Sequence, residues 1–164
     1  MIKLRMLAAA LLALGAAACG DVEIRREAAR DVHALLDAAY RNDRKTFGAY
    51  IDRPALRADL ERQLRHQAER KGVDLSRGVD PRALDRMIDP SAVQIQAALG
   101  LGGRSVPSPD RIAMMMRVSP EGRVCLLEPS IPPACVMTFE KQGDRWRLVA
   151  ASAPNIQIRT APRG

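Results

Sequence analysis

The sequence predicts an α+β protein in which N-terminal helices pack on a C-terminal four-stranded antiparallel meander. Between about residues 23 and 99, apolar residues recur every three or four positions, which is the period of one face of an α-helix. Over residues 111–152, apolar and polar residues alternate between turn signals, which is typical of half-buried strands. Because the two patterns occupy separate halves of the chain, the sequence favours segregated helices and strands over βαβ units.

Residues 21–41 form the first predicted helix. Val32 and Leu35 lie on its apolar stripe, and Asn42 interrupts the pattern. A short, partly apolar stretch follows at residues 46–51. We expect the stripe of the first helix to face the core.

Aspartate and proline mark the starts of three further predicted helices. The aspartate carboxylate can accept free backbone N–H groups at a helix start, and proline presets the first turn. The second helix ends at Gly72, a residue type that stops helices readily. These helices are predicted to start at residues 52–54, 80–81 and 89–90, and to end at about residues 71, 88 and 99.

Four strands are predicted beyond a glycine-rich connector at residues 100–103. Turn signals separate the first two strands and the last two, and a proline-rich segment joins the middle pair. Short links between successive strands predict an antiparallel meander. The predicted strands are residues 111–118, 123–128, 134–142 and 145–152.

The N-terminus has the pattern of an export signal over residues 1–18. A positive start is followed by an uncharged apolar run over residues 6–14, which is shorter than the roughly 20 residues that a membrane span requires. Small residues then precede Cys19, which resembles a lipobox, although Ala16 stands where that motif prefers leucine. In a lipobox the cysteine thiol is acylated, with fatty acids such as palmitate, and becomes the new N-terminus.

Acylation of Cys19 predicts a lipid-anchored protein of the cell envelope. More than one acyl chain gives firm attachment, whereas a single chain holds a protein only marginally. Gly20 rather than aspartate follows the cysteine, which by analogy with Gram-negative sorting indicates the outer membrane, on the side facing the periplasm. Ordinary cleavage near Ala18 and an uncleaved anchor are the alternatives.

Length and charge narrow the class of protein further. The chain after the signal has 146 residues and a net charge of about +5, which suits one domain. The charges are mixed in sign and Arg outnumbers Lys 22 to 4, which favours a solvated arginine-rich surface over an anion-binding patch. Export and the scarcity of aromatic residues argue against nucleic acid as a partner. We predict a tether at residues 19–22, one domain at 23–153 and a loosely ordered tail at 154–164.

Cys125 and Cys135 are predicted to form a structural disulfide. They fall on neighbouring strands and lie symmetrically about Ser130, so we expect them to be directly opposite each other. If lipid occupies Cys19, this pair accounts for the other two of the three cysteines. Two reduced thiols or a redox pair are the alternatives, and the redox interpretation lacks a C-x-x-C motif or a helix N-terminus.

A run of three methionines is the other unusual feature. Methionine suits adaptable apolar surfaces, so the first strand and its neighbours are candidates for a face that binds an apolar ligand or a partner. Ordinary burial of the strand on both sides is the alternative. The predicted face comprises Met114, Met115, Met116, Leu126 and Met137.

The sequence contains no recognisable catalytic or metal-binding motif. His33 and His66 have no second ligand at metal-binding spacing, and we expect both on the solvated surface. We therefore predict no catalytic residues, no metal ligands and no cofactor. A Ser–His–Asp site assembled in space remains an alternative, because such sites do not depend on sequence order.

Residues 51–64 resemble a block of an uncharacterised bacterial family, domain of unknown function 2939. The block starts Ile51-Asp52-Arg53-Pro54 after an amphipathic helix, and Arg53 replaces an aromatic residue that is usual in the family. The ending Gly143-Asp144-Arg145-Trp146 is also similar to that of the family. The resemblance spans about residues 23–152 and implies no activity, because none is established for the family. The order of helices and meander is also similar to NTF2-like domains, at the level of fold alone.

These observations favour a non-enzymatic, lipid-tethered envelope domain that binds an apolar ligand or an envelope protein through its sheet. The motivating pattern is apolar residues on both faces of the strands. A small envelope hydrolase with a spatially assembled site and a purely structural accessory lipoprotein are the alternatives.

Overall fold

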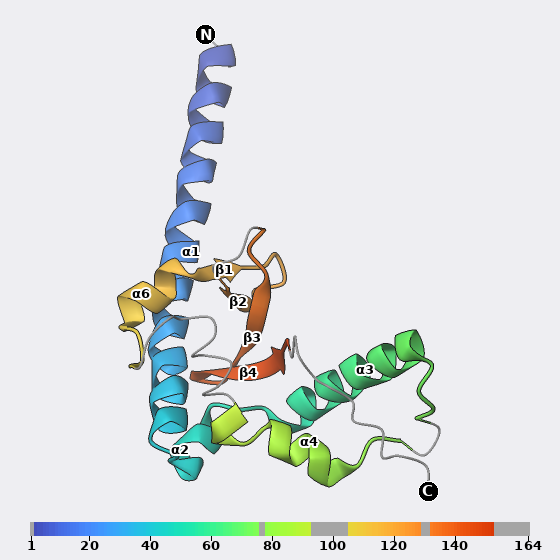
Figure 1. The fold of residues 1–164 in the computed structure, drawn as a ribbon. Coiled ribbons are helices and arrows are strands. Elements are labelled where there is room, and N and C mark those ends of the chain that lie inside the picture. Colours follow the sequence, from blue (N-terminus) through green and yellow to red (C-terminus); the bar gives the residue numbers. More distant parts are fainter. Residues whose placement is uncertain (1, 76–77, 93–104, 129–131, 153–164) are drawn as a thin grey trace, which may run out of the picture.

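The structure, a computed structural model, describes residues 2–75, 78–92, 105–128 and 132–152, and for residues 2–19 the backbone alone. Helices precede an antiparallel sheet, as the sequence predicts (Figure 1). The helices are α1 (Ile2–Tyr40), α2 (Arg44–Ala49), α3 (Arg53–Lys71), α4 (Pro81–Met87) and α6 (Pro109–Met114). The strands are β1 (Met116–Val118), β2 (Val124–Leu127), β3 (Cys135–Gln142) and β4 (Arg145–Ala151).

The sheet is a meander with the spatial order β1-β2-β3-β4, and every neighbouring pair is antiparallel. Gly122 and Gly143 adopt positive φ angles of 77° and 64° in the turns between β1 and β2 and between β3 and β4. Glycine adopts such angles without steric cost, so these residues permit the tight links. The predicted fold class and strand order are confirmed.

The predicted strand at 111–118 is wrong over its first half. Residues 109–114 form α6, because the hydroxyl of Ser108 accepts the backbone N–H of Arg111 and Pro109 occupies the first turn. The alternation of Ile112, Met114 and Met116 therefore runs across a helix and into a strand, and does not mark one face. Only Met116–Val118 pairs with β2.

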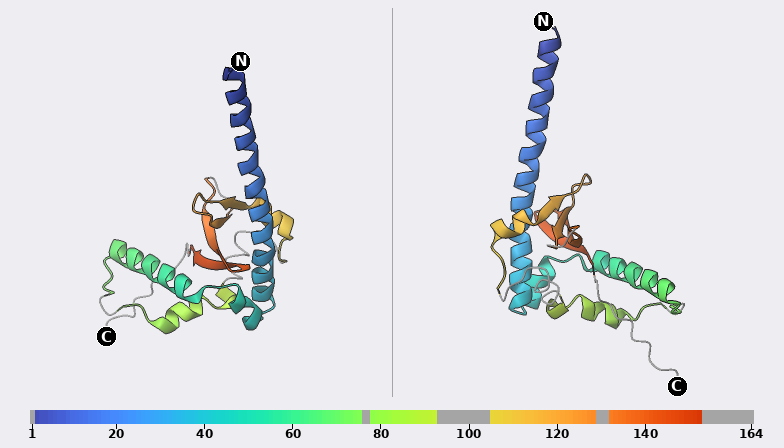
Figure 2. Two further views of the ribbon diagram at one scale, coloured as in Figure 1. Left: turned by 180° about the vertical axis from the view of Figure 1, so that it is seen from behind. Right: turned by 45° about the horizontal axis from the view of Figure 1, so that its top comes forward.

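Helix α1 extends beyond the predicted range of 21–41 at its N-terminal end. It begins at Ile2, and its first part projects away from the rest of the described chain (Figures 1 and 2). The predicted stripe is buried, with Val32 and Leu35 both fully inaccessible. The chain leaves the helix at Asn42, whose φ of 56° is a left-handed conformation that asparagine tolerates better than most residues.

Aspartate caps the helices where the sequence predicts it. The Asp52 carboxylate accepts the N–H of Ala55 at 3.0 Å, and Asp80 accepts the N–H of Arg82 at 3.0 Å. Gly72 ends α3 in the left-handed conformation, with φ of 63°. Asp89 likewise accepts the N–H of Ser91 at the start of a helical turn over residues 90–92. The rest of that predicted helix, the connector at 100–103 and the tail at 154–164 lie outside the described residues.

One face of the sheet forms the core together with the helices. Its side chains lie in cross-strand rows, such as Val124 opposite Phe139 and Phe139 opposite Leu148. All three are fully buried and belong to the same cluster as the apolar faces of α1, α3 and α4. Burial of apolar area on this scale is the main stabilising contribution in a domain with few aromatic residues.

The free edge of β4 is closed by groups from elsewhere in the chain. The Asp31 carboxylate of α1 accepts the backbone N–H of Trp146 at 2.8 Å. Residues 50–52 exchange backbone hydrogen bonds with Leu148, like a very short parallel strand. On α3, Asp59 accepts the N–H of Ala151 at 3.3 Å and Gln63 donates to its carbonyl at 2.9 Å. An open edge invites pairing with another chain, and these contacts prevent it.

We expect Asp52 to make stability depend on pH. The backbone N–H of Ala55 and the side-chain amide of Gln142 hold the pKa of Asp52 below its ordinary value of 3.8. A carboxyl group whose pKa is lower in the folded than in the unfolded protein stabilises the fold at pH values above its unfolded-state pKa. This contribution is lost as the pH falls through its folded-state pKa. Asp52→Asn keeps a capping oxygen but lacks the charge, so it should be about 0.3–1 kcal/mol less stable at pH 6.

The measurement is urea denaturation of both proteins between pH 6 and pH 2.5. The two stabilities should begin to approach each other as the pH falls below the ordinary value of 3.8, and they should converge once the pH is below the lowered pKa of Asp52. Asp144→Asn, in the exposed turn between β3 and β4, is the control and should follow the wild type throughout. Parallel curves for wild type and Asp52→Asn would contradict the assignment.

Candidate functional site

The outer face of the sheet carries a hollow built by three strands. In Figures 1 and 2, α1 and α6 lie to one side of β2 and β3, and no described helix covers their other side. The hollow has a volume of about 320 Å³. We call it the disulfide hollow, and its lining residues are Arg117, Ser119, Glu121, Arg123, Cys125, Leu127, Pro133, Cys135 and Thr138.

The predicted disulfide between Cys125 and Cys135 is present at the floor of this hollow. Their Cα atoms are 5.7 Å apart, within the usual range for a disulfide. The cysteines are not directly opposite, which corrects the predicted geometry. Cys125 lies opposite Thr138, and Cys135 lies opposite Leu127 across a register shift. An extra residue in one strand kinks the pair locally, and the bond therefore runs diagonally.

The two sulfur atoms have different surroundings. Cys125 is half-buried between Arg117 on β1 and Thr138 on β3, both directly opposite it. Side chains in such positions have Cβ atoms about 5 Å apart. Cys135 is exposed, and its Sγ lies 3.4 Å from the Thr138 hydroxyl oxygen. The disulfide thus joins an exposed cysteine to a half-buried one that lies opposite an arginine.

The rim of the hollow is polar and carries more positive than negative charge. Arg123 lies 3.9 Å from the carboxylate of Glu140, a long contact between two exposed side chains that contributes little stability. The pKa of Glu121 is lowered, chiefly by a hydrogen bond from the Ser119 hydroxyl. Among the described residues, no acidic side chain forms an ion pair with Arg117. The charged side chains that line the hollow are therefore two arginines, Arg117 and Arg123, and one carboxylate, Glu121.

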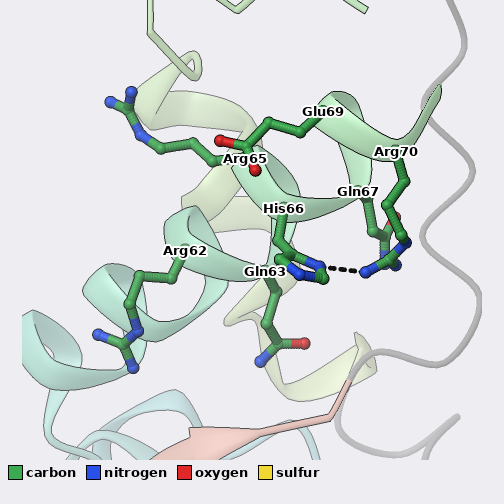
Figure 3. A pocket seen from close by; sticks show the side chains of 7 residues that line it. All are labelled: Arg62, Gln63, Arg65, His66, Gln67, Glu69 and Arg70. Atoms are coloured by element: carbon green, nitrogen blue, oxygen red, sulfur yellow. Dashed lines mark hydrogen bonds between the residues drawn. The ribbon is translucent and has the colours of Figure 1, made fainter. Parts of the chain in front are cut away.

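A second concave surface lies along α3 (Figure 3). It has a volume of about 610 Å³, and the described side chains that line it come from the one helix. His66 lies at its centre, where Arg70 donates a hydrogen bond to Nδ1 (Figure 3). We call it the α3 groove, and it is lined by Arg62, Gln63, Arg65, His66, Gln67, Glu69 and Arg70.

The disulfide hollow is the better candidate site of the two. In the α3 groove, Arg62 pairs with Asp59 at 2.7 Å and Arg65 with Glu61 at 2.6 Å, both within one helix. Long exposed side chains of this kind have many rotamers, and fixing them on binding is costly. In the disulfide hollow, Cys125 and Cys135 are instead held in place by the pairing of β2 with β3 and by the covalent bond between them.

The five residues of the predicted apolar face do not share a surface. Met116, Leu126 and Met137 form one row of the inner face and are at most 4 % exposed. Met114 lies on α6 and is 76 % exposed, and Met115 ends that helix half-buried. The prediction of a single face is wrong, because it rested on a continuous strand through residues 111–118.

The two histidines do not assemble a catalytic set. His33 is half-buried on α1, with Nδ1 2.9 Å from the carbonyl oxygen of Pro107, so it is less solvated than predicted. His66 is exposed on α3, as predicted. Within the described chain, neither ring forms a hydrogen bond with a serine hydroxyl or a carboxylate. The described residues also contain no group of three or more His, Cys, Asp or Glu placed to hold a metal ion.

The structure leaves the predicted anchor untested. Side chains up to Cys19 are outside the description, and α1 runs through this position as continuous backbone. Among the described helices, none combines the length and hydropathy that crossing a membrane requires.

Fold and site together define an α+β domain with a four-stranded meander and a disulfide hollow on its uncovered face. The family model for proteins of unknown function DUF2939 matches residues 10–95, just over half of the 164 residues. The chain belongs to this family. No curated protein and no solved structure matches it, so the similarity to NTF2-like domains stays a prediction.

The family match has a bearing on the site. It covers α1 to α4 and ends before the sheet, whereas the resemblance read from the sequence extended to residue 152. The disulfide hollow therefore lies outside the matched stretch. Sequence reasoning found its two cysteines but missed Arg117, Arg123 and Thr138, because only the strand register brings these side chains together.

Proposed function

We propose that this protein is a lipid-anchored component of the bacterial envelope, tethered through Cys19, whose domain binds a protein partner in the disulfide hollow without catalysing a reaction. The observation that carries the binding role is the hollow on the sheet face that the described helices leave uncovered. The anchor is supported by the apolar run and small residues before Cys19, and by an odd cysteine whose two companions are paired with each other.

A protein partner fits the hollow better than an apolar small molecule. Its apolar floor is small, with Leu127 half-buried and Pro133 exposed beside the disulfide. Three residues of the predicted apolar face, Met116, Leu126 and Met137, are buried in the core that the sheet shares with the chain's own helices. A small apolar centre within a polar rim is the usual composition of a protein–protein contact.

The charge of the rim indicates the chemistry of the partner. Arg117 and Arg123 are exposed and can form charge-assisted hydrogen bonds with a carboxylate. We therefore expect a segment that places a small apolar side chain over Leu127 and an acidic side chain against Arg117. Opposite charges at a rim mainly raise the association rate and select the partner.

Site-specific photo-crosslinking in cells tests the binding role. A photoreactive amino acid in place of Arg123 should give one discrete adduct, and the same substitution at Arg86, an exposed position on α4, should not. Arg117→Glu, added to the variant with the photoreactive residue at position 123, should reduce the adduct about tenfold or more. The new carboxylate would repel the acidic side chain of the partner that Arg117 attracts. Equal adducts from both positions, or none from Arg123, would refute the hollow as the binding site and favour a structural role.

Mass spectrometry of the mature N-terminus tests the anchor separately. The expected first residue is Cys19, carrying acyl chains. A different first residue, or an unmodified Cys19, would remove the tether from the proposal and leave the binding role to be judged by crosslinking.

A further inference from the structure

The disulfide in the hollow has features that a purely structural bond does not need. Both cysteines line a concave, accessible surface instead of being sealed in the core. Cys135 is exposed, whereas the sheet side chains on the opposite face, such as Phe139, are fully buried. Access of a thiolate to one sulfur is the first requirement for thiol–disulfide exchange.

The second requirement is a stable leaving group. When a thiolate attacks Sγ of Cys135, the exposed cysteine, the departing sulfur is that of Cys125. Cys125 lies directly opposite Arg117, which is not paired with any described acidic side chain. A neighbouring guanidinium favours a thiolate over a thiol, and a leaving thiol of lower pKa departs faster. The same cation attracts an incoming thiolate.

We propose that the disulfide hollow is a thiol–disulfide exchange site, at which Cys135 is attacked by a protein dithiol of the thiol–disulfide oxidoreductase class. The proposal rests on the same hollow as the proposed function and concerns the class of its partner, but its test needs no partner protein. The sequence has neither a C-x-x-C motif nor a helix N-terminus at these cysteines that would stabilise a thiolate. In the proposal, Arg117 takes that role.

The exchange takes two steps. In the first, the partner's thiolate forms a bond to Sγ of Cys135, the bond between Cys125 and Cys135 breaks, and its electron pair leaves on Sγ of Cys125. In the second, the partner's other thiol gives its proton to water and attacks the partner's own sulfur in the mixed disulfide, which releases the Cys135 thiolate. The partner leaves as a disulfide, and this chain gains two electrons and, from water, two protons.

Reduced glutathione serves as the probe, with the full-length protein folded and without denaturant. After acid quenching, trypsin releases residues 124–141 as one peptide that contains both cysteines, since no Arg or Lys lies between Arg123 and Lys141. Fragmentation of this peptide should place glutathione on Cys135 and a free thiol on Cys125. An adduct that forms only after denaturation, or one located mainly on Cys125, would overturn the proposal.

Variants at Arg117 test the role of the cation. Arg117→Gln should slow adduct formation about three- to tenfold, because the departing Cys125 thiolate loses the positive charge opposite it. Arg117→Lys should recover most of the rate, and Arg86→Gln on α4 should leave it unchanged. Equal rates for Arg117→Gln and wild type would overturn the assigned role. If glutathione exchanges but no crosslink forms at Arg123, only the stable complex with a partner is rejected. If the crosslink forms but glutathione does not exchange, only the exchange proposal is rejected.

Discussion

Replacing Phe139 with alanine is expected to lower the free energy of unfolding by about 3–5 kcal/mol. Phe139 is fully buried at the centre of the sheet, between Val124 on β2 and Leu148 on β4. Its ring belongs to the cluster that joins the inner face of the sheet to α1, α3 and α4. The chain has only two phenylalanines, so few other side chains of this size are available to fill the cavity.

Guanidinium denaturation followed by Trp146 fluorescence measures this effect. Trp146 is the single tryptophan and is 3 % exposed, so its emission should report loss of the core. Tyr40→Ala is the matched control, because it truncates an aromatic side chain that is 59 % exposed at the end of α1. We expect the control to change stability by less than about 1 kcal/mol. Similar losses for both variants would show that the sheet and helices do not share one core.

Removing the disulfide is expected to cost about 2–3 kcal/mol of unfolding free energy. The bond joins residues separated by ten positions, and in the entropy model it restricts the unfolded chain by closing that short loop. The double variant Cys125→Ala with Cys135→Ala removes the constraint without leaving a free thiol. The strands remain paired through their backbones, so the variant should still fold.

A reductant provides the internal comparison for this prediction. Dithiothreitol should lower the denaturation midpoint of the wild type to that of the double variant, and it should have no effect on the double variant itself. If the hollow admits thiols, dithiothreitol should reduce the disulfide while the protein is folded. The lower midpoint should then be reached within the time that glutathione needs to form its adduct. A midpoint unaffected by the double substitution would show that backbone pairing alone holds β2 and β3.

The family and the candidate site occupy different parts of the chain. DUF2939 is matched across α1 to α4, which supply one wall of the core and the groups that close the edge of β4. The disulfide hollow lies on β1, β2 and β3, beyond the match. Whether other family members have the two cysteines is therefore a direct question for their sequences, and the proposed exchange applies to those that do.

Local chemistry in the sequence predicted both ends of α3 and α4 and the C-terminal end of α1. Asp52 and Asp80 cap helices because carboxylate and backbone N–H groups a few residues apart interact in any chain, and Gly72 ends α3 for a similarly local reason. The alternation over residues 134–152 predicted two strands because one face of a sheet must be buried. The same rule failed at residues 111–115, where the capping of α6 by Ser108 outweighed a chance alternation.

By itself, the sequence determined the fold class, the order of the meander and the pairing of Cys125 with Cys135, because each depends on patterns of residues close together in the chain. Only the tertiary structure decided which of the two cysteines is exposed, which arginine lies opposite Cys125, and how α1 and α3 close the edge of β4. Those features depend on strand register and on packing between distant elements. A shift of one residue moves a side chain to the opposite face, so no local pattern contains this information.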